Sequence, residues 1–537
     1  MQNKSNIPSP VREKTKSEIT VARLSETITQ HVSMSKMAQL LSIKDWSERC
    51  GHISKLFSKA LDLSNVMYYK EMFYWFEADM YRWVPDGFLE LSVEEAMLKC
   101  GVTEGDMFKN RNSLIRPSKS YATARTLVPS NEIISFDNGV LNVSTLEFCD
   151  PSPALPVITK LGYGYHPEAK CPLWDKFLLE VLPFEQDRLC FQEFAGMIFI
   201  DRKKVRMEKI CILIGSGSNG KSVAAEVIAG LLGSWNVSRS SLTSLMGEGT
   251  NVMGAIAKID GKLLNISNEL DKKELHGAGF KSLVSGDPAD AKNLYKNRYT
   301  AYDIPLLMAS TNELPYTDDK SDGFYRRLMI LEFILQITDE MKDPLLINKL
   351  CKELSGIFNW ALEGRARFEA QDYINTKNER SAEIVKEYQI QQSAELSFVY
   401  SAGYMPMPCY FEHQDLEITA ATLYDQFKTY CSTYGRKLSS IKTFGMMLKS
   451  DGFSKVRERS NVVYTYFKAP SYDELEQLHK EGRTNATQDE WDKIINGHIK
   501  PVGGTVKPEF IPKKESKQQS LPLKDYCDRD PDDYPPE

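Results

Sequence analysis

Long apolar runs are missing from this sequence of 537 residues. The longest, residues 189–200, is interrupted by Gln192 and Glu193 and is much shorter than the ~20 residues that cross a bilayer as a helix. Residues 1–17 are polar and basic, and they lack the apolar centre of a secretory signal. We therefore expect neither a membrane-spanning protein nor a secreted precursor, and we interpret residues 1–17 as a disordered arm.

Paired cysteines and clustered histidines are missing as well. The ten cysteines are scattered from Cys50 to Cys527 without a Cys-x-x-Cys pair, and the seven histidines show no metal-ligand spacing. Both patterns argue against a zinc site and against a disulfide framework. They indicate a reduced cytoplasm.

The sequence also has no excess of positive charge. It contains 67 Lys and Arg residues and 73 Asp and Glu residues, which gives a formal charge of −6. That average argues against a nucleic-acid partner, but it hides an uneven distribution. Residues 421–468 hold nine basic residues against three acids, whereas residues 524–537 hold six acids against two basic residues. A basic segment and an acidic tail cancel, so DNA binding is not excluded.

Hydrophobic periodicity and turn signals predict an α/β protein with several domains. Helical spacing covers residues 18–65, and the Asn138-Gly139 pair between apolar runs is typical of a β-hairpin. Further helices are predicted near 173–182, 186–199 and within 340–395. The predicted strands are 73–76, 81–84, 133–136, 140–143, 210–214, 262–266, 304–309 and 329–333. Residues 420–468 read as short helices followed by two strands.

One motif carries the chemistry. Residues 215–222 match G-x-x-x-x-G-K-[ST], after a buried strand and before a helix at 222–232. In that context backbone amides converge on phosphates at the positive end of the helix dipole. Lys221 would reach the β- and γ-phosphates, and Ser222 would hold Mg²⁺. The predicted ATP-binding residues are Gly215, Ser216, Gly217, Ser218, Asn219, Gly220, Lys221 and Ser222. A glycine-rich turn without a ligand is the alternative.

Polar residues follow two of the predicted strands. Glu269 follows strand 262–266 and is the candidate that polarises the attacking water and supports the metal, although Asn268 stands where an Asp is usual. Asn312 follows strand 304–309 and could orient water or sense the γ-phosphate. The alternatives are a surface acid for Glu269 and a turn residue for Asn312.

Two adjacent arginines, Arg326 and Arg327, precede strand 329–333. Either could act as an arginine finger that stabilises transition-state charge in a neighbouring subunit. Structural salt bridges are the alternative, and the sequence does not decide between the two residues.

The order of these features resembles that of the superfamily III helicases, specifically the phage, plasmid and poxvirus primase–helicase family. The ordered set is the phosphate loop, the strand before Glu269, Ser285-Gly286-Asp287-Pro288, the strand before Asn312, and the paired arginines. Residues 136–141, 165–169 and 171–174 resemble the domain before the ATPase, and residues 192–196 resemble its helical lead-in. The resemblance extends over about residues 65–470.

The resemblance implies an AAA+-like ATPase that works as a ring, most often a hexamer, and moves along DNA. It also implies a channel hairpin, here residues 291–299, whose cations Lys292, Lys296 and Arg298 would contact the strand. A solvated basic hairpin is the alternative. Residues 1–135 offer neither an Asp-x-Asp pair nor a zinc-binding cluster, so we expect no priming activity on this chain.

The basic segment 421–468 resembles the family's C-terminal winged helix. Lys442, Lys455 and Arg457 would contact duplex DNA, although a protein-docking winged helix remains open. Residues 518–523, Gln-Gln-Ser-Leu-Pro-Leu, are similar to the short peptides that bind bacterial sliding clamps.

We therefore expect an ATP-dependent replicative DNA helicase of a phage, plasmid or other mobile element. A replication initiator that uses ATP as an assembly switch is the main alternative, and a packaging ATPase is a weaker one. The expected domains are a disordered arm (1–17), a helical and hairpin-rich N-terminal domain of primase–helicase type (18–200), a superfamily III ATPase domain (201–395), a winged helix (396–470), and a helical extension with a flexible acidic tail (471–537).

Overall fold

A computed structural model describes most of the chain. The described residues are 16–69, 72–119, 132–247, 249–268, 270, 277–293, 298–317, 319–405, 416–458, 461–468, 477 and 480. Residues 1–15 of the expected arm, the acidic tail and residues 518–523 lie outside this part, whereas residues 16 and 17 of the expected arm are the first residues of a helix. Within it, no helix combines the length and the apolarity needed to cross a membrane.

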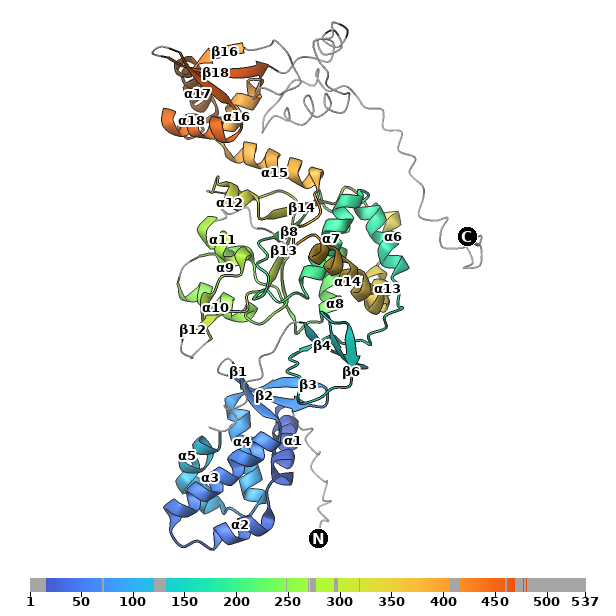
Figure 1. Cartoon of the computed structure of the whole chain (residues 1–537), viewed down its shortest axis with the longest axis vertical. Coiled ribbons are helices and arrows are strands. Elements are labelled where there is room, and N and C mark those ends of the chain that lie inside the picture. Colours follow the sequence, from blue (N-terminus) through green and yellow to red (C-terminus); the bar gives the residue numbers. More distant parts are fainter. Residues whose placement is uncertain are drawn as a thin grey trace, which may run out of the picture.

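The N-terminal region is helical and carries one small sheet (Figure 1). Its elements are α1 (Lys16–Gln30), α2 (Met34–Leu41), α3 (Trp46–Leu63), β1 (Val66–Tyr69), β2 (Met72–Glu77), β3 (Met80–Val84), α4 (Asp86–Lys99) and α5 (Glu104–Lys119). Apolar residues at helical spacing, among them Leu24, Ile28 and Phe57, are fully buried in one core. The predicted helices and the strands at 73–76 and 81–84 are confirmed.

A second small sheet connects this region to the centre of the molecule. It contains β4 (Ile133–Phe136), β5 (Gly139–Asn142), β6 (Glu147–Cys149) and β7 (Thr159–Lys160). The predicted hairpin at Asn138 is confirmed, because β4 and β5 pair antiparallel with Phe136 opposite Gly139. The Asn138 side chain also binds the backbone of Tyr165 in both directions, at 2.8 Å each.

The centre is a five-stranded parallel sheet in the order β14-β8-β13-β10-β9. Its strands are β8 (Ile210–Ile214), β9 (Val237–Ser238), β10 (Leu264–Ser267), β13 (Leu306–Thr311) and β14 (Leu328–Glu332). The surrounding elements are α6 (Pro172–Val181), α7 (Glu185–Met197), α8 (Lys221–Leu232), α9 (Leu242–Leu245), α10 (Thr250–Ile259), α11 (Gly277–Ser285), β11 (Ala289–Lys292), β12 (Arg298–Ala301), α12 (Asp322–Tyr325), the 3₁₀ turns at Asp339–Met341 and Cys351–Glu353, α13 (Leu346–Leu350) and α14 (Leu354–Ala370). The predicted α/β class is confirmed.

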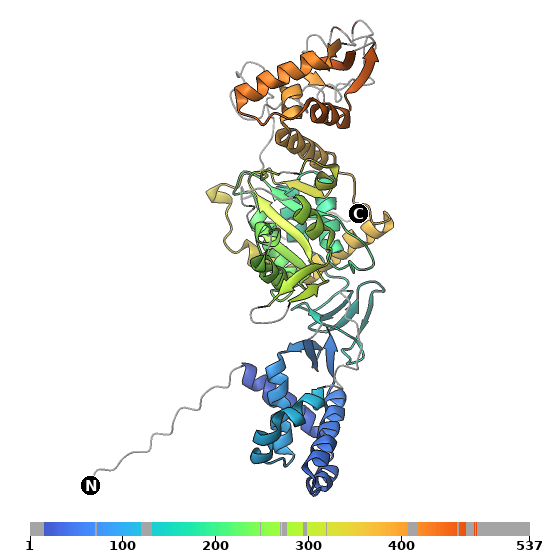
Figure 2. The same ribbon diagram turned by 90° about the vertical axis from the view of Figure 1, so that its left-hand side faces the viewer.

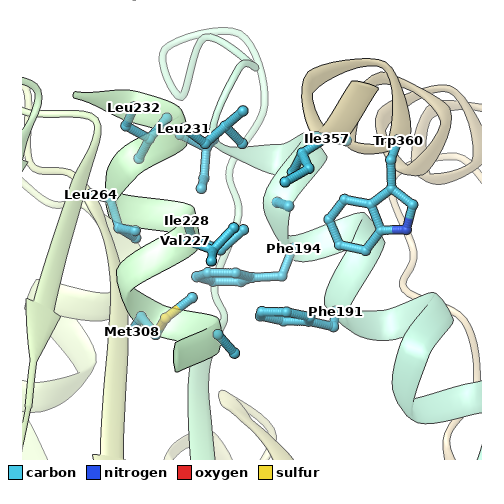
Figure 3. Close-up of a cluster of buried hydrophobic side chains, with 14 of the residues drawn as sticks. Phe191, Phe194, Val227, Ile228, Leu231, Leu232, Leu264, Met308, Ile357 and Trp360 are labelled. Atoms are coloured by element: carbon cyan, nitrogen blue, oxygen red, sulfur yellow. The ribbon is translucent and has the colours of Figure 1, made fainter. Parts of the chain in front are cut away.

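One face of the sheet is covered by α7, α8 and α14 (Figure 3). Side chains from these helices meet β10 and β13 in a single buried cluster, with Phe194, Ile228 and Met308 fully enclosed. Helices α7 and α14 cross closely, because a Cβ atom on Gly364 would stand 2.1 Å from the carbonyl oxygen of Gln192. Glycine is therefore required at this crossing.

The C-terminal unit lies at the far end of the molecule from the N-terminal helices (Figures 1 and 2). It follows α15 (Glu379–Gln392) and contains α16 (Ala394–Ser401), β15 (Tyr404–Met405), β16 (Leu416–Thr419), α17 (Ala420–Tyr434), α18 (Ile441–Ser450), β17 (Ser454–Glu458) and β18 (Asn461–Lys468). Phe427 and Phe444 stack with ring centroids 4.7 Å apart inside its own core. The predicted helices followed by two paired strands are confirmed.

Two predicted strands begin two residues later in the structure than expected. Strand β10 covers 264–267 instead of 262–266, and β13 covers 306–311 instead of 304–309. Pro305 has no backbone N–H and cannot donate to the neighbouring strand, so β13 begins after it. As a consequence Ser310 and Thr311 belong to the strand, and Asn312 is the first residue beyond it.

Candidate nucleotide-binding site

The loop of residues 215–220 connects β8, the second strand of the five-stranded sheet, to the first turn of α8. Several of its residues adopt left-handed backbone conformations, with φ of +100° at Gly217 and +89° at Gly220. A Cβ atom on Gly220 would also stand 2.7 Å from Cγ1 of Val181 on α6. Glycine is needed here both for the backbone conformation and for the close approach to α6. The loop therefore ends at the exposed amide groups of the α8 N-terminus.

Lys221 is buried at the first position of α8. Its Nζ donates to the carbonyl oxygen of Gly215 at 2.7 Å, to Oδ1 of Asn219 at 3.0 Å and to Oδ1 of Asn312 at 3.3 Å. All three acceptors are uncharged. Burial lowers the pKa of Lys221 below its usual value. The ammonium group is therefore fixed in position and holds a positive charge that these three contacts do not neutralise.

Asn219 has a structural role that the motif does not reveal. Its Nδ2 donates to the carbonyl oxygen of Phe333 at 3.0 Å, while its Oδ1 accepts from Lys221. A Cβ atom on Gly215 would stand only 2.0 Å from this Nδ2. Asn219 thus ties the loop to the segment after β14, and the glycine at 215 makes room for it.

Strand register brings Asn312 to the loop. Thr311 of β13 pairs with Ile214 of β8, so the residue after each strand lies at the same edge of the sheet. Asn268 follows β10, the next strand, at that edge. A cavity of about 320 Å³ opens there. It is lined by Gly217 to Val223, Asn268, Ser310, Thr311, Asn312, Ile337 and Lys342.

Lys342 and Ile337 were not among the predicted site residues. Both come from the segment after β14, where the amide of Ile337 donates to the carbonyl oxygen of Ser218 at 2.8 Å. They are more than a hundred residues from the loop in the sequence, and no motif marks them. Only the position of β14 beside β8 brings them to the cavity.

The acidic candidate Glu269 lies outside the described residues. Its neighbour Asn268 accepts from Arg239 at 3.3 Å, and Arg239 in turn forms a bidentate ion pair with Glu226 of α8 at 2.7 and 2.8 Å. Ser222 lines the cavity beside Lys221. In the described part of the chain, no group of three or more His, Cys, Asp and Glu side chains could by itself hold a metal ion.

Arg326 and Arg327 lie at the opposite end of the sheet. The carbonyl oxygen of Arg327 accepts from the amide of Ile210, the first residue of β8, whereas the phosphate loop follows the last residue of that strand. The whole length of β8 therefore separates the two arginines from the cavity of the same chain.

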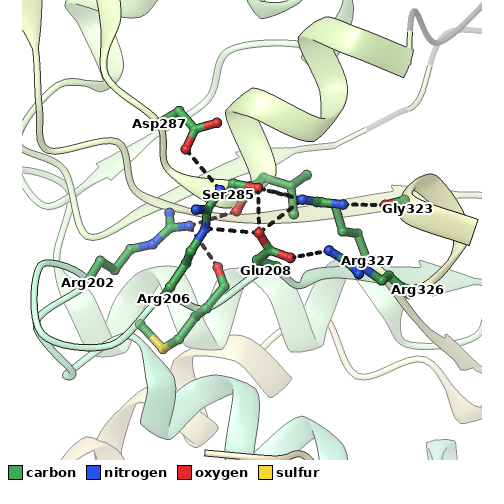
Figure 4. Close-up of polar contacts among 10 residues, drawn as sticks. Arg202, Arg206, Glu208, Ser285, Asp287, Gly323, Arg326 and Arg327 are labelled. Carbon is green, nitrogen blue, oxygen red and sulfur yellow. Dashed lines mark hydrogen bonds and ion pairs between the residues drawn. The ribbon is translucent and has the colours of Figure 1, made fainter.

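The two arginines differ in their surroundings (Figure 4). The Arg327 side chain is 8% exposed; it binds Oε1 of Glu208 at 3.0 Å, Ser285, and the carbonyl oxygen of Gly323. The Arg326 side chain is 65% exposed and, within the described part of the chain, has one ion pair, to Oε2 of Glu208 at 3.0 Å. Arg327 is thus enclosed in its own chain, and Arg326 can reach another molecule.

Glu208 is the common partner of these arginines, and no sequence motif marks it. Burial would raise the pKa of its carboxyl group, but Arg327, Ser285, Arg206 and Arg326 outweigh that effect and hold the pKa below its usual value. Arg206 also pairs with Asp287 at 3.3 Å. The Ser285–Pro288 segment singled out in the sequence is therefore part of this charge cluster.

The hairpin predicted at residues 291–299 corresponds to β11 and β12, which pair antiparallel with Lys292 directly opposite Arg298. Ala291 and Ala301 are fully buried and anchor it to the core, while Arg298 is exposed. Lys296 lies outside the described residues. The two described cations therefore stand at the same end of an anchored hairpin, away from the cavity.

The predicted duplex-contacting residues lie in the C-terminal unit. Lys442 is exposed in the first turn of α18. Lys455 and Arg457 lie on β17, where they oppose Tyr464 and Val462 of β18, and their side chains are outside the described part. This unit is separate from the cavity and from the hairpin.

Comparisons with known proteins match two parts of the chain. Residues 54–183 match the family model described as D5 N terminal like, and residues 213–327 match a family of unknown function, DUF5906. The first match supports a relationship to the phage and plasmid primase–helicases. It points to a replication protein of the phage type. The second match spans the phosphate loop, the strand tips and the paired arginines.

Solved structures of the C terminal region of NrS-1 are similar to this chain. One apo structure is 12% identical, covers 76% of this chain and 98% of its own, and has a TM-score of 0.44. A second apo structure is 13% identical, with 76% and 97% coverage and the same TM-score of 0.44.

Proposed function

We propose that this protein is an ATP-dependent DNA helicase that acts in the replication of a phage, plasmid or other mobile element. The observation that carries this proposal is the environment of Lys221, a buried ammonium group held by three uncharged oxygens beside a helix N-terminus. Among the described residues this group has no negative partner, and a nucleotide triphosphate would supply one.

The cavity beside Lys221 fits ATP and Mg²⁺ in its chemistry. The amides of residues 217–222 would hold the phosphates, Lys221 would bind the β- and γ-phosphates, and Ser222 with Glu269 would hold the metal. Bound Mg²⁺ neutralises charge on the phosphates during hydrolysis. Asn312 is fixed by Lys221 and lies where it can orient the attacking water.

We assign the arginine finger to Arg326. Arg326 is exposed and lies at the amino ends of the strands. It would therefore act on the nucleotide of a neighbouring chain in a ring, for which we propose a hexamer. Arg327 would hold the α12–β14 connection in place through Glu208 and Ser285. Glu208 would keep Arg326 oriented until a neighbour's phosphates compete for it.

In this mechanism DNA is contacted at two places. Lys292, Lys296 and Arg298 of the hairpin would hold a single strand through its phosphates. The C-terminal unit would act as a winged helix, with Lys442 of α18 in the major groove and Lys455 and Arg457 on the backbone. ATP hydrolysis at the sheet edge would then move the hairpin and the strand that it holds.

A strand-displacement assay with 3′- and 5′-tailed forks, run with and without ATP, tests the proposal. Lys221→Ala should abolish ATP hydrolysis and unwinding while leaving duplex binding intact. The matched control is Lys55→Ala, which removes an exposed lysine of α3 and should change neither activity. Full DNA-stimulated hydrolysis by Lys221→Ala would refute the mechanism.

A sliding clamp is a further proposed partner, through residues 518–523. The support is the Gln-Gln-Ser-Leu-Pro-Leu sequence, in which a glutamine and two leucines could fill apolar pockets. A pull-down of the clamp that is unchanged by Leu521→Ala with Leu523→Ala would refute this partner.

A further inference from the structure

A second, larger cavity lies at the amino ends of the strands, at the other end of the sheet from the nucleotide site. We call it the amino-end cavity; its volume is about 540 Å³. Its walls come from the segments that precede β8, β10 and β13, and from Tyr69 of β1 in the N-terminal region. The residues used below are Asp201, Arg202, Lys203, Lys262, Tyr302 and Asp303. None of them belongs to the proposed hydrolytic machinery.

Arg202 contributes a buried cation to this cavity. Its guanidinium group donates to the carbonyl oxygens of Ile304 and Pro305 at 2.9 and 2.7 Å, and to those of Met207 and Val284 at 3.0 and 2.7 Å. Its Nε is buried without a hydrogen-bond partner among the described residues. Burial lowers the pKa of Arg202 to about 10. The fixed guanidinium group therefore retains one unused donor and a charge that carbonyl groups do not neutralise.

Lys262 contributes a second cation. It donates to the carbonyl oxygen of Trp235 and forms no ion pair with a carboxylate within the described ranges. Burial lowers the pKa of Lys262 below its usual value. A desolvated ammonium group without a counter-ion is costly unless an anion approaches it.

The acids that line the cavity are already engaged. Asp303 pairs with Lys203 at 3.2 Å, and Asp201 accepts from the amide of Lys203 at 2.9 Å. Asp287, outside the cavity, pairs with Arg206. Among the described residues, Lys262 is therefore the cation of the amino-end cavity without a carboxylate partner, whereas Arg202 interacts electrostatically with Asp287 and forms no ion pair with it.

Two residues connected to this cavity have exposed aromatic side chains. Tyr302 lines the cavity and is 58% exposed; it directly follows β12 of the hairpin. Trp235, whose carbonyl oxygen binds Lys262, is 83% exposed. Cations that hold phosphates next to aromatic rings that stack bases are the general means by which proteins bind single strands.

We propose that the amino-end cavity is a second single-stranded DNA site, which takes the nucleotides next to those held by the β11–β12 hairpin. Lys262 holds a backbone phosphate, to which the enclosed charge of Arg202 adds a longer-range attraction; Tyr302 stacks on a base, and Trp235 stacks on a neighbouring one. The strand is expected here because Tyr302 is covalently continuous with the hairpin and lies four residues from Arg298 in the sequence. This inference rests on the proposed function, since the hairpin presents the strand.

Equilibrium binding of a labelled oligothymidylate without ATP tests the inference. Tyr302→Ala and Lys262→Gln should each weaken binding by about tenfold, the loss expected for one stacked base or one phosphate contact, and should leave DNA-independent ATP hydrolysis unchanged. Tyr302→Phe should bind like the wild type, because the ring is kept. The matched controls are Phe108→Ala, an exposed aromatic of α5 that is 90% exposed, and Lys55→Ala.

The outcomes distinguish this inference from the proposed function. If Lys292→Ala with Arg298→Ala weakens binding but Tyr302→Ala and Lys262→Gln do not, the second site is refuted and the helicase proposal stands. If the wild-type protein binds no single strand at all, both are refuted. Photo-crosslinking with a thiothymidine-containing strand gives an independent readout, and a peptide containing Tyr302 or Trp235 is the expected product. Crosslinks that avoid both residues would overturn the inference.

Discussion

The Nζ of Lys221 lies 3.3 Å from Oδ1 of Asn312, so the catalytic lysine candidate and the polar tip of β13 are in direct contact. The asparagine side chain in this contact carries no charge. A carboxylate at 312 would pair with the ammonium group and compete with the phosphates for it. We therefore predict that Asn312→Asp raises the KM for ATP by about tenfold, roughly the effect of a charge–charge contact of ~1.4 kcal/mol. Steady-state kinetics of ATP hydrolysis measure this change in KM.

The matched variant is Asn312→Ser, which keeps a polar group but is too short to reach Lys221. It should lower kcat more than it raises KM, because the water-orienting amide is lost. Equal effects of the two substitutions on KM would contradict the predicted role of charge at this position.

A second prediction concerns the exposed Arg326. If this residue acts on a neighbour's nucleotide, Arg326→Ala and Lys221→Ala should complement each other. Each variant alone should be inactive, but mixed rings contain sites where an intact Lys221 faces an intact Arg326. We predict that a mixture of the two hydrolyses ATP at a fraction of the wild-type rate, measured as a function of mixing ratio. A mixture as inactive as its parts would contradict action between subunits.

Arg327 should behave differently, since its side chain is enclosed and binds Glu208 and Ser285. Arg327→Ala leaves the Glu208 carboxylate with fewer partners and removes a buried hydrogen-bonding group. We predict a loss of stability of about 3 kcal/mol, the usual cost of breaking a buried ion pair. The matched variant Arg326→Ala should shift the thermal midpoint by less than one degree or so, because an exposed pair contributes little. Similar shifts of the thermal midpoint for both variants would contradict the assignment of a structural role to Arg327 and not to Arg326.

The features of this fold and site that could be predicted from the sequence are those formed by residues close together along the chain. The strand, loop and helix around Lys221 follow from local pattern, because apolar runs, glycines and the helix start are contiguous. The hairpin at Asn138 was predictable for the same reason. The position of Asn312 was also accessible, although Pro305 moved the strand by two residues.

The contacts that define the site most closely were not predictable. Asn219 binds the carbonyl oxygen of Phe333, and Lys342 enters the cavity, only because β14 pairs with β8 across more than a hundred residues. The difference between Arg326 and Arg327 also depends on Glu208, whose side chain reaches both. No local pattern separates two adjacent arginines, since burial is a property of the packed molecule.

A fourth prediction follows from the lowered pKa of Glu208. A carboxyl group whose pKa is lower in the folded state stabilises the fold above its unfolded pKa of about 4.3, and this contribution is lost as the pH falls through the folded value. The wild type should therefore lose stability on acidification from about pH 5 to about pH 3, and Glu208→Gln should lose less over that interval. Thermal unfolding at several pH values measures it. Parallel pH profiles of the two proteins would contradict the role of Glu208.

The last prediction concerns the connection between the central sheet and the C-terminal unit. Lys386 of α15 pairs with Asp451, which follows α18, and the hydroxyl group of Tyr400 donates to the same carboxylate at 2.5 Å. The Asp451 side chain is only 2% exposed, so its charge depends on these two partners. Lys386→Met should leave that carboxylate without its positive partner and weaken the attachment of the C-terminal unit by about 3 kcal/mol.

The matched control is Lys377→Met, because the Lys377 side chain is 87% exposed and pairs with Glu379 at 3.3 Å. Limited proteolysis should cleave Lys386→Met between α15 and α16 faster than the wild type or the control. If Asp451→Asn is added to Lys386→Met, the buried charge is removed and protection should return. Equal cleavage rates for all four proteins would show that α15 holds the C-terminal unit without this ion pair.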